Sequence, residues 1–234
     1  IELYKTNYYT EEYLNTANGS SYSNSFYDHK LIHSEIKSIY KPKDNQTYVF
    51  GLGYNNETLK RTYFTTKPEF KSPYAYIQYD FNPKENLNII VGGRYDNHNK
   101  YKSQFSPKSA VRYELNDKIS IKTSLGYGYK APDFRQLYFN FTNATVGYTV
   151  LGYNAVSEVL PQLISEGQIA NIVVPLSEFN DKLKAETSTS LNLGSDITFS
   201  PEVSSKINLF YNNVINLIDT RVVANKINGQ NVFS

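Results

Sequence analysis

Hydrophobic and polar residues alternate with a period of two along most of the chain. The clearest stretch runs from Ile119 to Tyr129, where apolar, aromatic or threonine residues alternate with polar residues or glycine. Because successive side chains of a strand point to opposite faces, this pattern predicts a strand with one apolar face. The same split recurs at 48–54, 75–81, 87–95, 111–115 and 191–199, and less cleanly at 205–217. The pattern predicts an all-β fold of nine strands and the start of a tenth at Asn231.

The links between these strands alternate in length. Short turns rich in Pro, Asn and Asp lie at 41–45, 82–86, 116–118 and 200–204, and longer links lie at 15–30, 57–71, 99–106, 129–183 and 218–230. In an antiparallel up-and-down sheet, consecutive links fall on opposite rims, so one rim carries the short turns and the other the long loops. Transmembrane β-barrels have this asymmetry, and strands of about ten residues suit a bilayer crossing.

A soluble β-sandwich or barrel produces the same alternation, because an apolar face reads alike whether it points inward or outward. Three features favour a membrane barrel: the unequal rims, the excess of tyrosine over other aromatic residues, and charged residues on the polar faces. Tyrosines near strand ends predict aromatic girdles, at Tyr40, Tyr54, Tyr74, Tyr95, Tyr127 and Tyr129. The charged polar-face residues are predicted to face the lumen: Arg94, Asp96, Arg112, Glu114 and Lys122.

Composition narrows the function classes. The chain has 234 residues and a formal charge of +2, with 24 Lys+Arg against 22 Asp+Glu, which argues against a nucleic-acid binder. It has no Cys, so disulfides, thiolate metal sites and thiol nucleophiles are excluded. Its mean hydropathy is −0.51 and it has no run of 18 apolar residues, which excludes a spanning helix but not a spanning barrel.

The two ends of the chain suggest a processed or excised segment. The sequence starts at Ile1 without an initiator Met or a signal peptide, and it stops at Ser234 inside a predicted strand. A lipid-exposed sheet cannot leave an open edge, because unpaired backbone groups in hydrocarbon are costly. We therefore expect either a closed ten-stranded barrel or, more in keeping with the ending, part of a larger one.

The link at 129–183 contains the one clear helical period. Its apolar positions are Val156, Val159, Leu160, Leu163 and Ile164. This spacing predicts a short amphipathic helix at about 155–166, with Asn154 as N-cap and Gly167 as the C′ residue. The apolar stripe is expected to pack on neighbouring loops or the barrel rim, with a ligand or partner contact as the alternative.

Two segments flanking this link resemble motifs of one family. The segment Gly126-Tyr-Gly-Tyr-Lys-Ala-Pro-Asp-Phe-Arg-Gln-Leu-Tyr138 resembles the F-R-A-P box of TonB-dependent outer-membrane receptors. Asn180-Asp-Lys-Leu-Lys-Ala-Glu-Thr-Ser188 resembles their N-P-x-L-K-P-E-x-S box, with Asp181 and Ala185 in place of its two prolines. Further similar pieces are Gly92–Asp96, Ser106–Ala110 and Leu217–Asp219.

The resemblance implies an antiparallel transmembrane barrel of about 22 strands around a plug, of which residues 1–234 are one part. Its plug and C-terminal strands would lie outside this chain. The implied function is import of a scarce nutrient across the bacterial outer membrane with energy from TonB, which would act through the missing N-terminal region. The implied partners are membrane lipid, the nutrient, TonB and, as a further candidate, a surface lipoprotein. No enzymatic activity, resident cofactor or metal is expected.

The expected nutrient is an iron chelate, either a ferric siderophore or haem. Haem receptors of this family carry a histidine in the loop between the two boxes, but 130–182 contains none; His29, His33 and His98 lie elsewhere. Siderophore receptors commonly use aromatic and basic side chains at the loop bases. Beside Arg61, the candidates here are Tyr63, Tyr101, Lys130, Arg135, Phe139, Phe141, Tyr148 and Tyr153.

The sequence alone is also compatible with other functions. Cobalamin or another nutrient of the same family lacks a diagnostic side chain. A small self-contained barrel, either an adhesin or an outer-membrane hydrolase, is a different class. For the hydrolase, Asp28 and His29 would point to opposite faces of a strand, and Asp96 and His98 lack a serine-centred nucleophile motif.

Overall fold

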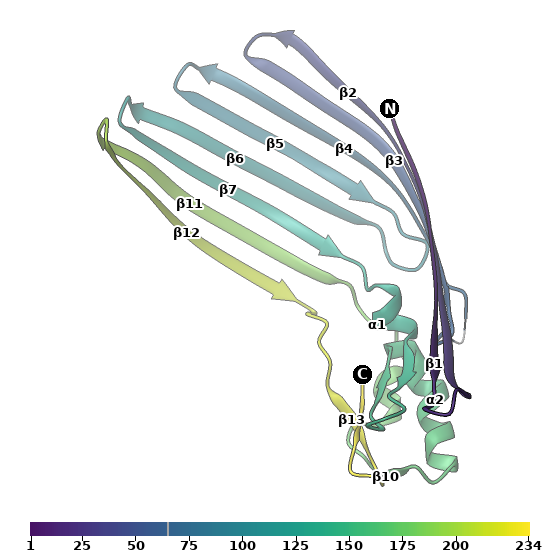
Figure 1. Cartoon of the computed structure of the whole chain (residues 1–234). Coiled ribbons are helices and arrows are strands. Elements are labelled where there is room, and N and C mark those ends of the chain that lie inside the picture. Colours follow the sequence, from purple (N-terminus) through teal and green to yellow (C-terminus); the bar gives the residue numbers. More distant parts are fainter. Residues whose placement is uncertain (65) are drawn as a thin grey trace.

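A computed structural model describes residues 1–64 and 66–234. Its main body is a nine-stranded sheet in the order β1-β2-β3-β4-β5-β6-β7-β11-β12, in which every neighbouring pair is antiparallel (Figure 1). We call this sheet the wall. Its strands are β1 (Glu2–Asn15), β2 (Ser21–Lys43), β3 (Gln46–Arg61), β4 (Glu69–Lys84), β5 (Leu87–Asp96), β6 (Gln104–Asn116), β7 (Ile119–Lys130), β11 (Glu186–Ser200) and β12 (Val203–Ile215).

The alternation of short turns and longer links is confirmed, but two links are shorter than predicted. β2 starts at Ser21, so the first link spans 16–20 rather than 15–30, and β3 and β4 leave only 62–68 between them. Thr65, inside the predicted link 57–71, lies outside the described residues. The prediction failed because pairing continues beyond the apolar band: the polar residues Lys30 and Thr58 are still partners in the ladder.

A second sheet lies beyond the loop rim of the wall and has its own core (Figure 1). We call it, with its helix, the cap. Its strand order is β10-β13-β14-β9-β8. The elements of the cap are β8 (Asn140–Thr142), β9 (Thr149–Leu151), α2 (Tyr153–Ser165), β10 (Ile169–Ile172), η1 (Leu176–Phe179), β13 (Val222–Lys226) and β14 (Asn231–Phe233).

The strand predicted at Asn231 exists, but it is not a tenth wall strand. β14 pairs with β13 and runs parallel to β9, with Val232 opposite Thr149. The edge strands β1 and β12 of the wall do not pair with each other, so the described residues form an open sheet rather than a closed ten-stranded barrel.

Helix α2 forms where the apolar period predicts it, but one end differs. The N-cap is Gly152, not Asn154. A Cβ at Gly152 would stand 2.5 Å from the Leu137 backbone, so the close approach there requires glycine. At the other end, Gly167 takes φ +68 and donates its N–H to Ile164, which confirms it as the C′ residue.

The apolar stripe of α2 packs within the cap. Val156 and Leu160 are fully buried against Leu151, Val223 and other core residues, whereas the predicted stripe member Ile164 is 39% exposed. The expected packing of this stripe on neighbouring loops is therefore confirmed. Among the described residues, no helix has the length and apolar character to cross a membrane.

The two faces of the wall differ as the alternation predicts. The outer face carries large exposed apolar side chains such as Leu52, Leu125 and Leu209. Near its turn rim, Tyr48 stacks on Tyr79 with ring centroids 4.4 Å apart. The inner face carries the polar and charged side chains, and the long link packs on it near the loop rim.

One predicted girdle residue faces the other way. Tyr74 is opposite Gly53 and is 6% exposed, and its ring would meet a Cβ at Gly53 at 2.1 Å. Tyr76 lies in the same way over Gly51. Both hydroxyls donate to Glu35, at 2.6 and 2.8 Å, so Tyr74 belongs to the polar inner face.

Candidate functional site

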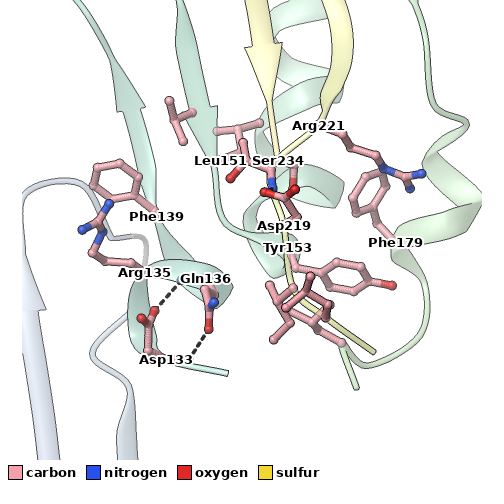
Figure 2. A pocket seen from close by; sticks show the side chains of 15 residues that line it. Asp133, Arg135, Gln136, Phe139, Leu151, Tyr153, Phe179, Asp219, Arg221 and Ser234 are labelled. Carbon is pink, nitrogen blue, oxygen red and sulfur yellow. Dashed lines mark hydrogen bonds between the residues drawn. The ribbon is translucent and has the colours of Figure 1, made fainter. Parts of the chain in front are cut away.

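The long link between β7 and β11 is anchored on the inner face of the wall by a short helix, α1 (Phe134–Tyr138). Phe134 stacks on Phe70 with centroids 4.1 Å apart, and Leu137 is buried in the same cluster with Leu59. Asp133 caps the helix: its carboxylate accepts from the Gln136 backbone N–H, and the Gln136 side chain accepts from the Asp133 N–H (Figure 2). This anchor holds the residues that follow α1, from Phe139 onward, against the inner face of the wall near its loop rim.

Arg61, the last residue of β3, is surrounded by aromatic rings. Its guanidinium lies 4.9 Å from the ring centroid of Phe139 and between 5.2 and 5.8 Å from those of Tyr63, Tyr27 and Phe64. Its Nε is buried without a hydrogen-bond partner. No ion pair of the described residues includes Arg61. Among the described residues, aromatic rings therefore surround this positive charge and no carboxylate is paired with it.

A second guanidinium shares one of these rings. Arg135 of α1 lies 5.6 Å from the centroid of Phe139, and it too is in none of the ion pairs found among the described residues. Figure 2 shows its side chain beside Phe139. Two uncompensated cations near one ring repel each other, so this arrangement favours an anionic ligand between or beside them.

The rings continue away from the arginines as a chain of contacts. Tyr63 meets Phe141 edge-on at 5.2 Å, Phe139 stacks on Phe141 at 5.8 Å, and Phe141 contacts Tyr148 at 6.2 Å. The backbone ties this chain to the wall, because the N–H of Asn140 donates to the carbonyl of Tyr63 (2.8 Å). Edge-to-face and stacked pairs of this kind hold aromatic side chains in fixed orientations.

A pocket of about 640 Å³ opens beside this cluster, between α1 and the cap (Figure 2). Arg135 and Phe139 lie on one side of it, and Tyr153, Phe179 and Arg221 on the other. Arg221 is neutralised by Glu178 at 2.6 Å, and the Tyr153 hydroxyl donates to the Glu178 carbonyl. Arg135 is therefore the lining cation that is in no ion pair of the described residues, and Asp133 and Asp219 add two carboxylates to the same lining.

The structure brings most of the predicted binding residues together. Tyr63, Arg135, Phe139, Phe141 and Tyr148 form the contacts above, and Tyr153 lines the pocket. Tyr101 and Lys130 lie apart from this group. Arg61 joins this group, which the sequence alone does not indicate, because only the fold brings Phe139 to it.

Tyr101 and Lys130 are the two predicted residues outside this group. Tyr101 packs edge-on against His98 at 5.2 Å, beside the α1 cluster, and burial raises its pKa well above the usual value. Lys130 pairs with Glu186 across the β7–β11 ladder at 3.2 Å. Neither lines the pocket.

The five predicted lumen residues lie on the polar face of the wall, and each forms an ion pair there. Arg94 binds Asp96 (2.7 Å) and covers the ring of Tyr74 (3.7 Å to the centroid). The other pairs are Arg112 with Glu114 at 2.8 Å and Lys122 with Asp196. Among the described residues, no group of three or more His, Cys, Asp or Glu side chains is arranged to hold a metal ion.

A family model described as "TonB dependent receptor-like, beta-barrel" matches residues 2–234. No curated protein matches the sequence.

Several solved structures share the fold. The siderophore receptor PirA from Pseudomonas aeruginosa is 18% identical with a TM-score of 0.66, over 91% of this chain and 37% of its own. A variant of the ferric enterobactin receptor PfeA from the same organism is 13% identical with a TM-score of 0.64, over 98% and 35%. The FrpB iron transporter from Neisseria meningitidis is 13% identical with a TM-score of 0.54, over 90% and 31%. The chain thus spans about a third of the length of these proteins.

Proposed function

This chain belongs to the TonB-dependent receptor β-barrel family of the bacterial outer membrane, and from that premise we propose that its protein imports a ferric siderophore with energy supplied through TonB. The family is one of receptors rather than enzymes, as expected. The open edges of the wall argue against a small self-contained barrel. The inner-face ion pairs would line the interior of the larger barrel, where they would meet the plug.

The observation that carries the proposal is the pair of uncompensated arginines around Phe139. Arg135 and Phe139 line a pocket of about 640 Å³ and supply a positive charge and an aromatic ring there, and Arg61, which also contacts Phe139 but does not line the pocket, adds a second positive charge nearby. An anionic chelate with aromatic iron-binding groups satisfies both features, through charge-assisted hydrogen bonds and stacking. Three of the similar structures have names that refer to siderophore, ferric enterobactin or iron transport, which agrees with this cargo.

Haem and cobalamin fit these features less well. Haem carries carboxylates that arginine would bind, but the link with the arginine-bearing helix has no histidine for the iron. Cobalamin offers no polyanionic group to match two free guanidinium groups. The apolar stripe of α2, the surface that would have suited contact with a ligand-delivering lipoprotein, is covered within the cap.

Binding measurements on the full-length receptor test the proposal. The probes are an anionic ferric tris-catechol chelate, a neutral ferric hydroxamate chelate, haemin and cobalamin. We expect saturable binding of the tris-catechol chelate, weakened roughly 10- to 100-fold by Arg135→Ala, because a hydrogen bond to a charged group contributes about 1.5–3 kcal/mol. Iron uptake by cells should fall in parallel.

Lys130→Ala is the matched control, since it removes a nearby cation, at the end of β7, that is already paired with Glu186. We expect it to leave the affinity within about twofold, as for an exposed ion pair. Haemin or cobalamin binding with no response to Arg135→Ala would reject the siderophore assignment.

A further inference from the structure

The pocket between α1 and the cap has a carboxylate, that of Asp219, which the proposed function does not use. Asp219 lies in the segment between β12 and β13, and it lines the pocket together with Arg135. One of its oxygens accepts the backbone N–H of Thr220 at 2.7 Å. No ion pair of the described residues includes Asp219, so its negative charge is not neutralised by a cation of this part of the protein.

The backbone on both sides of Asp219 is held in place. Before it, the N–H of Ile218 donates to the Glu186 carboxylate at 2.9 Å, which ties the segment to the start of β11. After it, Arg221 and Ser234 exchange two backbone hydrogen bonds, at 2.7 and 2.9 Å. The position of the Asp219 carboxylate at the pocket is therefore set by the fold.

The two other charged side chains of the lining already have partners. Arg221 is paired with Glu178 rather than with Asp219. The Asp133 carboxylate caps α1, where it accepts a backbone N–H of that helix at 2.8 Å. Arg135 and Asp219 are thus the two lining residues, of opposite charge, that are in no ion pair of the described chain.

Arg135 and Asp219 line the same pocket without pairing with each other. Arg135 belongs to α1, whereas Asp219 lies with the cap residues that line the pocket, and Figure 2 shows both. The rest of the lining is largely apolar or aromatic, with Phe139, Tyr153 and Leu217 among its residues. Two separately anchored segments thus hold opposite charges apart at one apolar cavity. A ligand that carries both charges gains attraction at each of the two positions.

We propose that this pocket selects ferric chelates that carry a protonated amine in addition to their anionic iron-binding groups, with the amine at Asp219 and an anionic group at Arg135. The inference rests on the proposed function, because it adds a second recognition element for the same ligand. An ammonium donates charge-assisted hydrogen bonds to a carboxylate, and such bonds are about twice as strong as neutral ones. A chelate that lacks the amine covers the Asp219 carboxylate without giving it a donor, and therefore binds more weakly.

Binding of two matched chelates to the full-length receptor tests the proposal. Both are ferric tris-catechol chelates on one scaffold, and they differ only in whether a pendant aliphatic amine is free or acetylated. We expect the unaltered receptor to bind the amine form at least about tenfold more tightly, as for a hydrogen bond to a charged group. Asp219→Asn keeps the shape of the side chain and an acceptor for the Thr220 N–H, but it should bring the two affinities within about twofold.

Glu158→Gln is the matched control, because it removes an exposed carboxylate of α2 that does not line the pocket. It should retain the preference for the amine form, which separates recognition at Asp219 from general attraction of a cation to the cap. A charge reversal gives a second test. Asp219→Lys should prefer a third chelate in which the amine is succinylated and so carries a carboxylate.

Equal affinities of the amine and acetylated chelates for the unaltered receptor, or a preference that persists in Asp219→Asn, would overturn the inference. If Arg135→Ala still weakens both chelates in that case, the proposed function stands and only the role of Asp219 is rejected. A receptor that binds neither chelate saturably rejects the proposed function and this inference together.

Discussion

The wall and the cap, joined within one chain, are stabilised in opposite ways. Of the most buried apolar side chains in the part of the chain that the structure describes, only Leu59, Phe70 and Tyr74 belong to the wall, whereas the cap buries a cluster around Leu160 and Val223. The wall instead leaves Leu52 and Leu125 on its outer face 65% and 51% exposed.

The difference follows from the solvent that each part meets. In lipid, an apolar side chain gains nothing from burial, but an unpaired backbone group costs several kcal/mol, so the wall depends on its continuous ladder. In water, the cap requires a conventional core, because burial of apolar area is its main source of stability. A substitution should therefore harm one part while sparing the other.

The largest expected effect is on the cap core. Leu160→Ala removes a fully buried side chain from α2 and should destabilise the cap by about 2–5 kcal/mol, since the helix and sheet cannot close the cavity completely. Limited proteolysis should then cut the link at 131–185. The wall should stay folded, as shown by an unchanged heat-dependent shift in gel mobility.

Ile164→Ala is the control on the same helix. Its side chain is 39% exposed, so the loss should stay below about 1 kcal/mol. Unfolding of the wall together with the cap in Leu160→Ala would show that the two parts form one cooperative unit, contrary to the comparison.

The next effect separates the two faces of the wall. Leu125→Arg places a charge on the lipid-facing side of β7, where it should cost about 2–4 kcal/mol and reduce assembly into membranes. Ser124→Arg introduces the same residue one position away, on the polar face, and should assemble normally. The measurement is the amount of folded receptor in outer-membrane fractions. Equal loss in both variants would mean that the faces are wrongly assigned.

The wall was predictable from sequence because its period of two is local. Ile119 to Tyr129 reads as a strand without knowledge of its neighbours, and β7 matches it within one residue. Tyr74 was misassigned because its orientation depends on pairing: only the register puts it over Gly53, with room for a flat ring. The predicted lengths of two links were wrong for a related reason: polar residues continue the strand pairing beyond the apolar band, toward the loop rim.

The cap was predictable only at its helix. β8, β9 and β14 have three residues each, too few to show a period, and β14 pairs with a strand far away in sequence. The cluster of rings around Arg61 was not predictable for the same reason. Arg61 and Phe139 lie on different elements, and nothing local in either segment indicates that they meet.

The smallest expected effect is a pH dependence of stability at His98, which lies where the wall meets the link between β7 and β11. Its ring packs against Phe70 (4.8 Å) and Tyr101, and the Lys100 backbone N–H donates to Nδ1 (3.1 Å), which requires that nitrogen to be unprotonated. Burial, and secondarily Lys100, lower the pKa of His98 below its usual value. Glu57 and Asp133 line the pocket that His98 also lines.

Because the pKa of His98 is lowered in the folded state, the unfolded state binds a proton there at a higher pH than the folded state does. The contribution of His98 to stability is therefore complete above the usual histidine pKa and declines as the pH falls from there toward the folded value. The thermal midpoint of the receptor in detergent should drop between pH 7.5 and 5.5, and His98→Gln should reduce that drop. An identical drop in His98→Gln would assign the acid sensitivity to other groups and leave the contact between wall and link independent of pH.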